Sequence, residues 1–287
     1  MTKNNYLKGD CSNMITCDFH THSTASDGSF SPSEVVKKSF DKGVKYLSLT
    51  DHDTLTGIDE AKSMAESLGI TFIPGIELST SHNKETVHLL GFFKGDDYKN
   101  IELNNFLQEL KDNRIKRAEE IVNRLKKFNN IEIKVEDVLK NGKDTIARPH
   151  IAKTIIEAGY PYDYDYIFKN FIGDNCPAYI PANKMSTEDG ISLLKKYNAK
   201  VFLAHPVLLK KISVHDILPL GIDGIEAVYA LNSDKEEKRF RKFANKNNLL
   251  ISCGSDSHGI ENDSGHGSLG SMSLDEETLE NFINSVK

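Results

Sequence analysis

The chain has 287 residues, of which 38% are hydrophobic and 27% are charged, and its formal net charge is -6. This length fits one large α/β domain, or one domain that carries an insert. The acidic balance argues against a protein that coats long duplex nucleic acid through a broad basic surface. The sequence has no apolar run of about 18 residues, so we expect no membrane span.

The N-terminus and the cysteines both point to a cytoplasmic protein. Residues 1–13 are polar and lack the apolar region of a secretory signal. The chain has four cysteines, which are Cys11, Cys17, Cys176 and Cys253. They form no Cys-x-x-Cys pair, which is typical of reduced thiols rather than of a disulfide framework or a zinc knuckle.

The first part of the chain alternates short apolar segments with amphipathic segments. Strands are predicted over residues 14–17, 46–50, 70–76 and 87–92, and helices over residues 32–42 and 58–68. The first helix has Ser31 as its expected N-cap, with Pro32 and Glu34 in the first turn. Such alternation predicts βα units and a parallel sheet, either as a barrel or as an open sheet.

Residues 99–181 differ from this pattern and are predicted to be a helical insert. Apolar residues recur at helical spacing from Leu103 to Leu125, which predicts one long helix or a bent pair. Shorter helices are predicted over residues 137–141 and 149–158, and residues 162–166 are expected to form a loop. The α/β domain would then consist of residues 1–98 and 182–287.

The alternation resumes after the insert. Strands are predicted over residues 200–204, 224–228 and 249–253, and helices over residues 187–197, 233–247 and 275–286. Because sites form at the C-terminal ends of strands in barrels and in open α/β sheets, polar residues at these ends are candidates for function.

Histidines and carboxylates gather at the predicted strand ends. His20 and His22 are spaced i and i+2, so on a strand they face the same side and can chelate one ion. Six of the ten histidines belong to this set, and burying so many imidazoles without partners would be costly. Nitrogen and oxygen ligands without thiolate suit Zn, Mn or Fe, and nine ligands suit two or three ions. The set comprises His20, His22, Asp27, His52, Glu77, His88, His205, Asp256 and His258.

Four short motifs occur in order: His20-Thr21-His22, Thr50-Asp51-His52, Ala204-His205-Pro206 and Asp256-Ser257-His258. In these motifs the chain resembles the polymerase and histidinol phosphatase (PHP) family of metal-dependent phosphoesterases. The resemblance implies a distorted (β/α)7 barrel and a trinuclear metal centre. It assigns the first ion to His20, His22, Glu77 and Asp256, the second to Glu77, His88 and His205, and the third to Asp27, His52 and His258.

Two more motifs lie in the insert: Ile146-Ala147-Arg148-Pro149-His150 and Pro177-Ala178-Tyr179-Ile180-Pro181. Both are similar to the nucleoside 3',5'-bisphosphate phosphatase subgroup, some members of which also act as 5'-to-3' exonucleases on short RNA. This resemblance implies that Arg148 and His150 are catalytic residues that bind substrate phosphate. The chemistry agrees, because both residues flank a predicted helix start that favours an anion, and arginine binds phosphate as a fork.

The sequence therefore predicts a hydrolase of nucleotide phosphomonoesters that uses two to three divalent ions (Mn, Fe or Zn) and a hydroxide shared by two of them. The expected partner is a small phosphorylated substrate, such as a nucleotide or a short oligoribonucleotide. A histidinol phosphate phosphatase shares the metal core, but the helical insert argues against it. A non-catalytic metal-binding accessory domain of a polymerase is a further alternative. The complete ligand set and the absence of a polymerase segment argue against that one.

Overall fold

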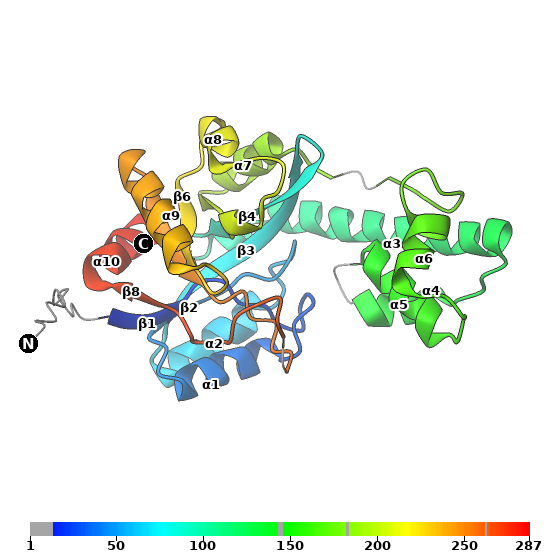
Figure 1. The fold of residues 1–287 in the computed structure, drawn as a ribbon. Helices are drawn as coiled ribbons and strands as arrows, with labels where there is room; N and C mark the ends of the chain where they lie inside the picture. The colour runs from blue at the N-terminus through cyan, green and yellow to red at the C-terminus, as the bar shows by residue number, and fades with distance from the viewer. Residues whose placement is uncertain (1–13, 143–145, 182–183, 262) are drawn as a thin grey trace, which may run out of the picture.

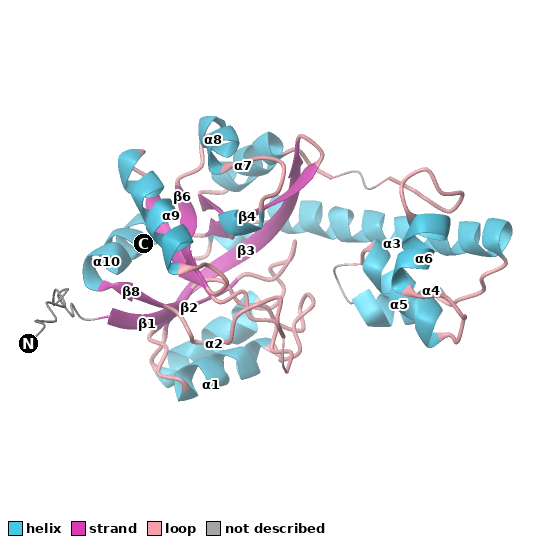
Figure 2. Cartoon of the chain, in the orientation of Figure 1, coloured by secondary structure: helices cyan, strands magenta, loops and turns pink. Residues whose placement is uncertain are grey.

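The computed structural model describes residues 14–142, 146–181, 184–261 and 263–287 (Figure 1). One sheet of eight strands has the order β7-β6-β5-β4-β3-β2-β1-β8. Figure 2 shows that the strands gather in one part of the molecule, with helices and loops around them. The strands are β1 (Met14–Asp18), β2 (Tyr46–Leu49), β3 (Thr71–His82), β4 (Glu85–Phe92), β5 (Lys200–Leu203), β6 (Gly224–Tyr229), β7 (Leu250–Gly254) and β8 (Ser273–Asp275).

The first seven strands nearly close into a barrel, which confirms the predicted fold class. The backbone N–H of Phe19 donates to the carbonyl of Cys253 at 3.0 Å, so the chain after β1 meets β7. The short strand β8 pairs antiparallel with β1 outside this ring. Cys17 and Cys253 face each other at the seam with their sulfurs 3.3 Å apart, and both are free thiols, as is Cys176.

The longer helices of the α/β part follow the expected positions closely, whereas the short helix α8 and the 3-10 turns were not predicted. They are α1 (Pro32–Asp41), α2 (Ile58–Leu68), α7 (Thr187–Lys196), α8 (Val214–Ile217), α9 (Asp234–Lys246) and α10 (Glu276–Val286), with the 3-10 turns η1 (Asp97–Lys99), η3 (Pro206–Leu208) and η4 (Leu218–Leu220). Ser31 caps α1 by accepting from the N–H of Glu34, whose carboxylate accepts from the N–H of Ser31. Phe282 of α10 packs on the buried ring of Phe19, so the last helix shares the barrel core.

The expectation of a parallel sheet throughout is wrong at β3 and β4. These strands form an antiparallel hairpin, and β4 is also antiparallel to β5. Strand β3 continues to His82, so Glu77 lies inside β3 and His88 lies inside β4 rather than at strand ends. The hairpin turns at Asn83 and Lys84, both with positive φ, which is the geometry of a tight two-residue turn.

The insert begins with one unbroken helix, α3 (Ile101–Asn129), and continues with α4 (Val135–Gly142), α5 (Arg148–Glu157), α6 (Tyr164–Ile167) and the π-helix η2 (Phe168–Ile172). The predicted loop over residues 162–166 is wrong at its end, because Asp163 caps α6 by accepting from the N–H of Tyr166 at 2.7 Å. Figure 1 shows α3 extending from the barrel into the group of smaller helices.

Helix α3 connects two separate hydrophobic cores. Leu103 and Leu107 near its start pack in the barrel core, whereas Ile121 and Leu125 near its end pack in a second core within the insert. The predicted division at residues 98/99 and 181/182 stays a prediction, and residues 182–183 lie outside the described residues.

No helix in the described part of the chain combines the length and the apolar character needed to cross a membrane. The expected cytoplasmic location stays a prediction, since it used residues 1–13, which lie outside the described residues together with Cys11.

Candidate metal centre

Glu77 lies at the middle of a buried cluster of imidazoles. Its Oε1 contacts two ring nitrogens and its Oε2 contacts three, at distances of 2.9–3.2 Å. The Glu77 residue itself has no exposed surface. Because it comes from β3 while its partners come from several strands and loops, the carboxylate joins both halves of the barrel. The five partners are His88, His205, His52, His20 and His22.

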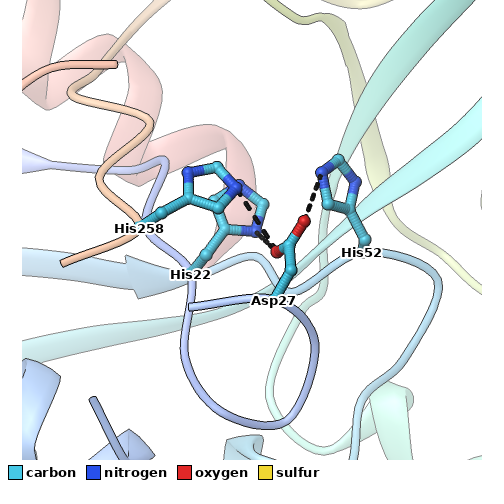
Figure 3. Close-up of side chains that lie close together, drawn as sticks. All are labelled: His22, Asp27, His52 and His258. Carbon is cyan, nitrogen blue, oxygen red and sulfur yellow. Dashed lines mark ion pairs between the residues drawn. The ribbon is translucent and has the colours of Figure 1, made fainter. Parts of the chain in front are cut away.

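A second group surrounds Asp27, whose carboxylate lies between His22 and His258 on one side and His52 on the other (Figure 3). Its oxygens lie 3.3 Å from His258 Nε2, 3.8 Å from His22 Nδ1 and 3.8 Å from His52 Nε2. The ligand atoms of these four residues lie within 4.8 Å of one another. The rings of His22 and His52 thus each face Asp27 with one nitrogen and Glu77 with the other.

Asp256 completes a third group. Its Oδ1 lies 3.1 Å from His22 Nε2 and 3.3 Å from His20 Nε2. Together with Glu77 these residues form the set that the family resemblance implies for the first ion. The two other groups differ from the implied sets. His22 joins the group around Asp27, and His52 takes the place of His205 beside Glu77 and His88, although His205 Nε2 still lies 3.0 Å from Glu77 Oε1.

Five buried atoms of this cluster have no hydrogen-bond partner among the described residues. They are His20 Nε2, both ring nitrogens of His22, His52 Nδ1 and Glu77 Oε2. Burying polar atoms without a partner costs free energy, and a cation placed among their lone pairs removes that cost. Since the donors are imidazole nitrogens and carboxylate oxygens, the residues fit divalent ions such as Zn, Mn or Fe.

The carboxylates of the cluster hold their negative charge. Burial raises the pKa of Glu77, but the charges of His52 and His20 outweigh this effect, so its pKa lies well below the ordinary value. Burial raises the pKa of Asp256, but the charges of His20 and His22 outweigh this effect, so its pKa is likewise lowered. The carboxylates of the metal-free cluster are therefore ionised at neutral pH, and the raised pKa values of His20 and His22 mean that these rings balance part of the negative charge.

Sequence reasoning missed a buried carboxylate behind the cluster, Glu226 in β6. Its Oε1 lies 3.0 Å from His20 Nδ1, and its Oε2 accepts from the backbone N–H of His205 at 2.7 Å. It has no exposed surface. The available signal was a lone carboxylate in the otherwise apolar segment of residues 224–228.

Asp51, inside one of the four motifs, fixes the loop that carries the ligands His22 and Asp27. Its carboxylate accepts from the N–H of Ser23 at 2.8 Å and from the hydroxyls of Ser23 and Ser26. Burial raises the pKa of Asp51, and these hydrogen bonds oppose that shift. This residue thus holds the loop in the shape that brings Asp27 towards His258.

His266 lies at the edge of the cluster and was not among the predicted ligands. Its ring centroid is 4.1 Å from that of His258, and its Nδ1 lies 2.6 Å from the carboxylate of Asp263. With Asp256 and His258 it forms a fourth group of possible ligands.

Arg148 and His150 lie in the insert at the start of α5. Nη1 of Arg148 donates to the Asp174 carboxylate at 2.8 Å and to the carbonyl of Ile172 at 3.3 Å. His150 Nδ1 accepts from the N–H of Ala147 at 3.1 Å, which leaves the proton on Nε2. Burial lowers the pKa of His150 and the charge of Asp27 opposes this shift, so the start of α5 is within electrostatic range of the cluster. Phosphate binding by Arg148 and His150 stays a prediction.

Comparison with known proteins gives consistent matches. The PHP domain family model matches residues 18–171. A 5'-3' exoribonuclease from Haemophilus influenzae is 31% identical over 248 residues, which cover 84% of this chain and 89% of the relative. A 3',5'-nucleoside bisphosphate phosphatase from Chromobacterium violaceum is 28% identical over 254 residues, covering 85% of this chain and 88% of the relative. A Bifidobacterium adolescentis structure, assigned as a metal-dependent phosphoesterase, superposes with a TM-score of 0.75 and 28% identity, covering 96% of this chain and 98% of that one.

Proposed function

Because this chain belongs to the PHP domain family and is a metal-dependent phosphoesterase, we propose that its substrates are nucleotides. The proposed reaction removes the 3'-phosphate of nucleoside 3',5'-bisphosphates, with a 5'-to-3' exonuclease activity on short RNA. The names of the two relatives, an exoribonuclease and a bisphosphate phosphatase, support this substrate class. The observation that carries the proposal is the buried cluster around Glu77, whose unpartnered atoms suit a group of cations.

The proposed centre holds two to three ions of Mn, Fe or Zn. Bound ions of this kind supply an activated water near neutral pH and neutralise charge on a phosphate. The first ion is assigned to His20, His22, Glu77 and Asp256, the second to Glu77, His88 and His205, and the third to Asp27, His52 and His258. The separation of these residues into overlapping groups supports more than one ion.

The insert would supply the direct contacts to phosphate. The pair between Arg148 and Asp174 is exposed, with 72% of the Asp174 side chain accessible, and such surface pairs contribute little stability. A phosphate dianion can therefore replace Asp174 and accept a fork of two hydrogen bonds from Arg148. His150, with its proton on Nε2, would add a further donor.

Both alternatives have weaker support. A histidinol phosphate phosphatase would not need the long insert with Arg148. An accessory domain would not need a complete cluster of ligands with unpartnered atoms. We therefore favour a catalytic centre that acts on nucleotides.

The test is phosphate release by the metal-loaded protein from a nucleoside 3',5'-bisphosphate, histidinol phosphate and a simple aryl phosphate. Hydrogen bonds to charged groups contribute roughly 1.5–3 kcal/mol, so Arg148→Ala should lower kcat/KM for the bisphosphate about 10- to 100-fold. The aryl phosphate, which has no second phosphate, should lose much less. Arg239→Ala on α9, an exposed arginine of the barrel, is the control.

Each contrary result has a distinct meaning. Equal loss on both substrates would place Arg148 at the reacting phosphate and contradict its role in binding the second one. Preference for histidinol phosphate would favour the first alternative, and no phosphate release from any substrate would favour the accessory domain.

A further inference from the structure

Four side chains of the insert form a continuous stack, which we call the aromatic stack: Tyr164, Phe168, Arg148 and Tyr179. The rings of Tyr164 and Phe168 are nearly parallel, with an interplanar angle of 28° and centroids 4.9 Å apart. The guanidinium carbon of Arg148 lies 5.8 Å from the centroid of Phe168 and 5.2 Å from that of Tyr179. Both distances are within the range of cation–π contacts.

The outer end of this stack is open to solvent. Tyr164 is 43% exposed, and Tyr166, two residues further along the chain, is 47% exposed. The ring of Tyr166 in turn lies parallel to that of Tyr162, at 5° and 5.0 Å. Tyr166 also packs on Phe171 of the second core, with ring centroids 5.5 Å apart, whereas the only ring that Tyr164 contacts among the described residues is that of Phe168. Tyr164 is therefore the ring at the open end of the stack.

The aromatic stack starts at the arginine that is proposed to bind phosphate. Burial lowers the pKa of Arg117, and the charges of Arg148 and Arg114 add to this shift, so several cations lie near Arg148. Partial desolvation and the same arginines lower the pKa of Lys184. When the phosphate of a ligand binds these cations, the group that is attached to the phosphate would lie next to Phe168 and Tyr164.

Charge around the outer end favours an uncharged group over a phosphate. Asp163 and Asp165 flank Tyr164 in the sequence, and both are exposed. Their carboxylates would repel a second phosphate there. A flat nucleobase carries no charge, and every base has a face that can stack on an aromatic ring.

We propose that the aromatic stack binds the nucleobase of the substrate, so that the enzyme distinguishes nucleotides from other phosphate esters. This inference rests on the proposed function and adds the group that is recognised beside the phosphates. Because stacking is tolerant of sequence, the site accepts any of the bases. On short RNA the same site would hold one base of the single strand.

The first test compares adenosine 3',5'-bisphosphate with its abasic analogue, 1,4-anhydroribitol 3,5-bisphosphate, using the metal-loaded protein. Loss of the ring of Tyr164 should lower kcat/KM for the nucleotide about 5- to 100-fold in Tyr164→Ala. The abasic analogue, which has no base to stack on that ring, should lose much less in the same variant. Phe40→Ala on α1, where the ring is 46% exposed, is the matched control and should leave both substrates unchanged.

The second test measures stacking directly. The chain contains no tryptophan, so Tyr164→Trp introduces a single indole at the open end of the stack. Adenosine 5'-monophosphate should quench its fluorescence, whereas ribose 5-phosphate should not.

Several results would overturn the inference. Equal loss on the nucleotide and the abasic analogue, no loss on either, or absence of quenching would each show that the base does not bind there. A change from dimer to monomer in Tyr164→Ala, seen by light scattering, would instead assign the exposed rings to a second copy of the chain. If the nucleotide quenches the fluorescence but no phosphate ester is hydrolysed, the result supports base binding at the stack. It then contradicts only the proposed function.

Discussion

Replacing Glu226 with glutamine tests whether a carboxylate behind the cluster controls metal affinity. Glu226 lies 3.0 Å from His20 Nδ1 and accepts from the N–H of His205 at 2.7 Å. By keeping the proton of His20 on Nδ1, it leaves the lone pair of Nε2 free for an ion. Glutamine has nearly the same size but only one acceptor oxygen. Its amide N–H must therefore point at one of the two donors that the carboxylate satisfies.

The expected magnitude follows from these two contacts. Loss of a carboxylate that supports a metal-bound histidine lowers metal affinity about 10- to 100-fold, which corresponds to about 1.4–2.8 kcal/mol. A buried donor left without an acceptor costs about 1–3 kcal/mol, so both estimates agree. The Glu226→Gln protein should therefore lose metal to a competing chelator at a 10- to 100-fold lower chelator concentration than wild type.

The assay is a chelator titration of the metal-loaded protein, with bound metal measured by elemental analysis. Glu237→Gln on α9 is the control, because Glu237 pairs only with Arg241 among the described residues and lies outside the cluster. Circular dichroism checks that each variant is folded. If folded Glu226→Gln protein retains wild-type metal affinity, Glu226 does not orient His20 towards an ion, and our account of this residue is refuted.

Two further changes test the cluster itself. Elemental analysis of wild-type protein purified without chelator should show two to three equivalents of Mn, Fe or Zn. The Glu77→Gln protein should lose at least one equivalent of metal and most of its activity. Full metal occupancy and wild-type turnover in this variant would show that Glu77 is not a ligand. Asp51→Asn removes the negative charge and one of the two acceptor oxygens that hold Ser23 and Ser26. The free energy of unfolding, measured with urea, should therefore fall by about 1–3 kcal/mol. An unchanged urea midpoint would contradict the role of Asp51 in fixing this loop.

The sequence predicted the residues of the cluster better than their local structure. His20, His52 and Asp256 follow strands that pair in parallel, where the C-terminal ends meet, so their gathering follows from the alternation alone. Glu77 and His88 meet for another reason. His88 pairs with Ser79, which lies two residues beyond Glu77 on the same face of β3, so the antiparallel hairpin brings both side chains together.

The features that the sequence did not predict, namely the β3–β4 hairpin, the contact of Glu226 and helix α6, depend on turns or long-range contacts for which the sequence has no strong signal. The hairpin turns at Asn83-Lys84, without the Asn-Gly pair that is the strongest signal of such a turn. The contact of His20 with Glu226 joins residues 206 positions apart, and it exists only because the barrel closes between β1 and β7. Helix α6 has four residues, too few for a periodic pattern, and its start depends on Asp163.

The buried charges explain why the metal centre alone cannot select nucleotides. Three divalent ions among Asp27, Glu77, Asp256 and the additional carboxylate Glu226 would leave a positive charge of about +2. Such a charge attracts any phosphate ester, whatever group the phosphate is attached to. On the function proposed above, the insert distinguishes between substrates, because Arg148 there would contact a phosphate while its guanidinium stacks between Phe168 and Tyr179. Relatives with this barrel but a different insert would then hydrolyse different phosphate esters with the same ligands.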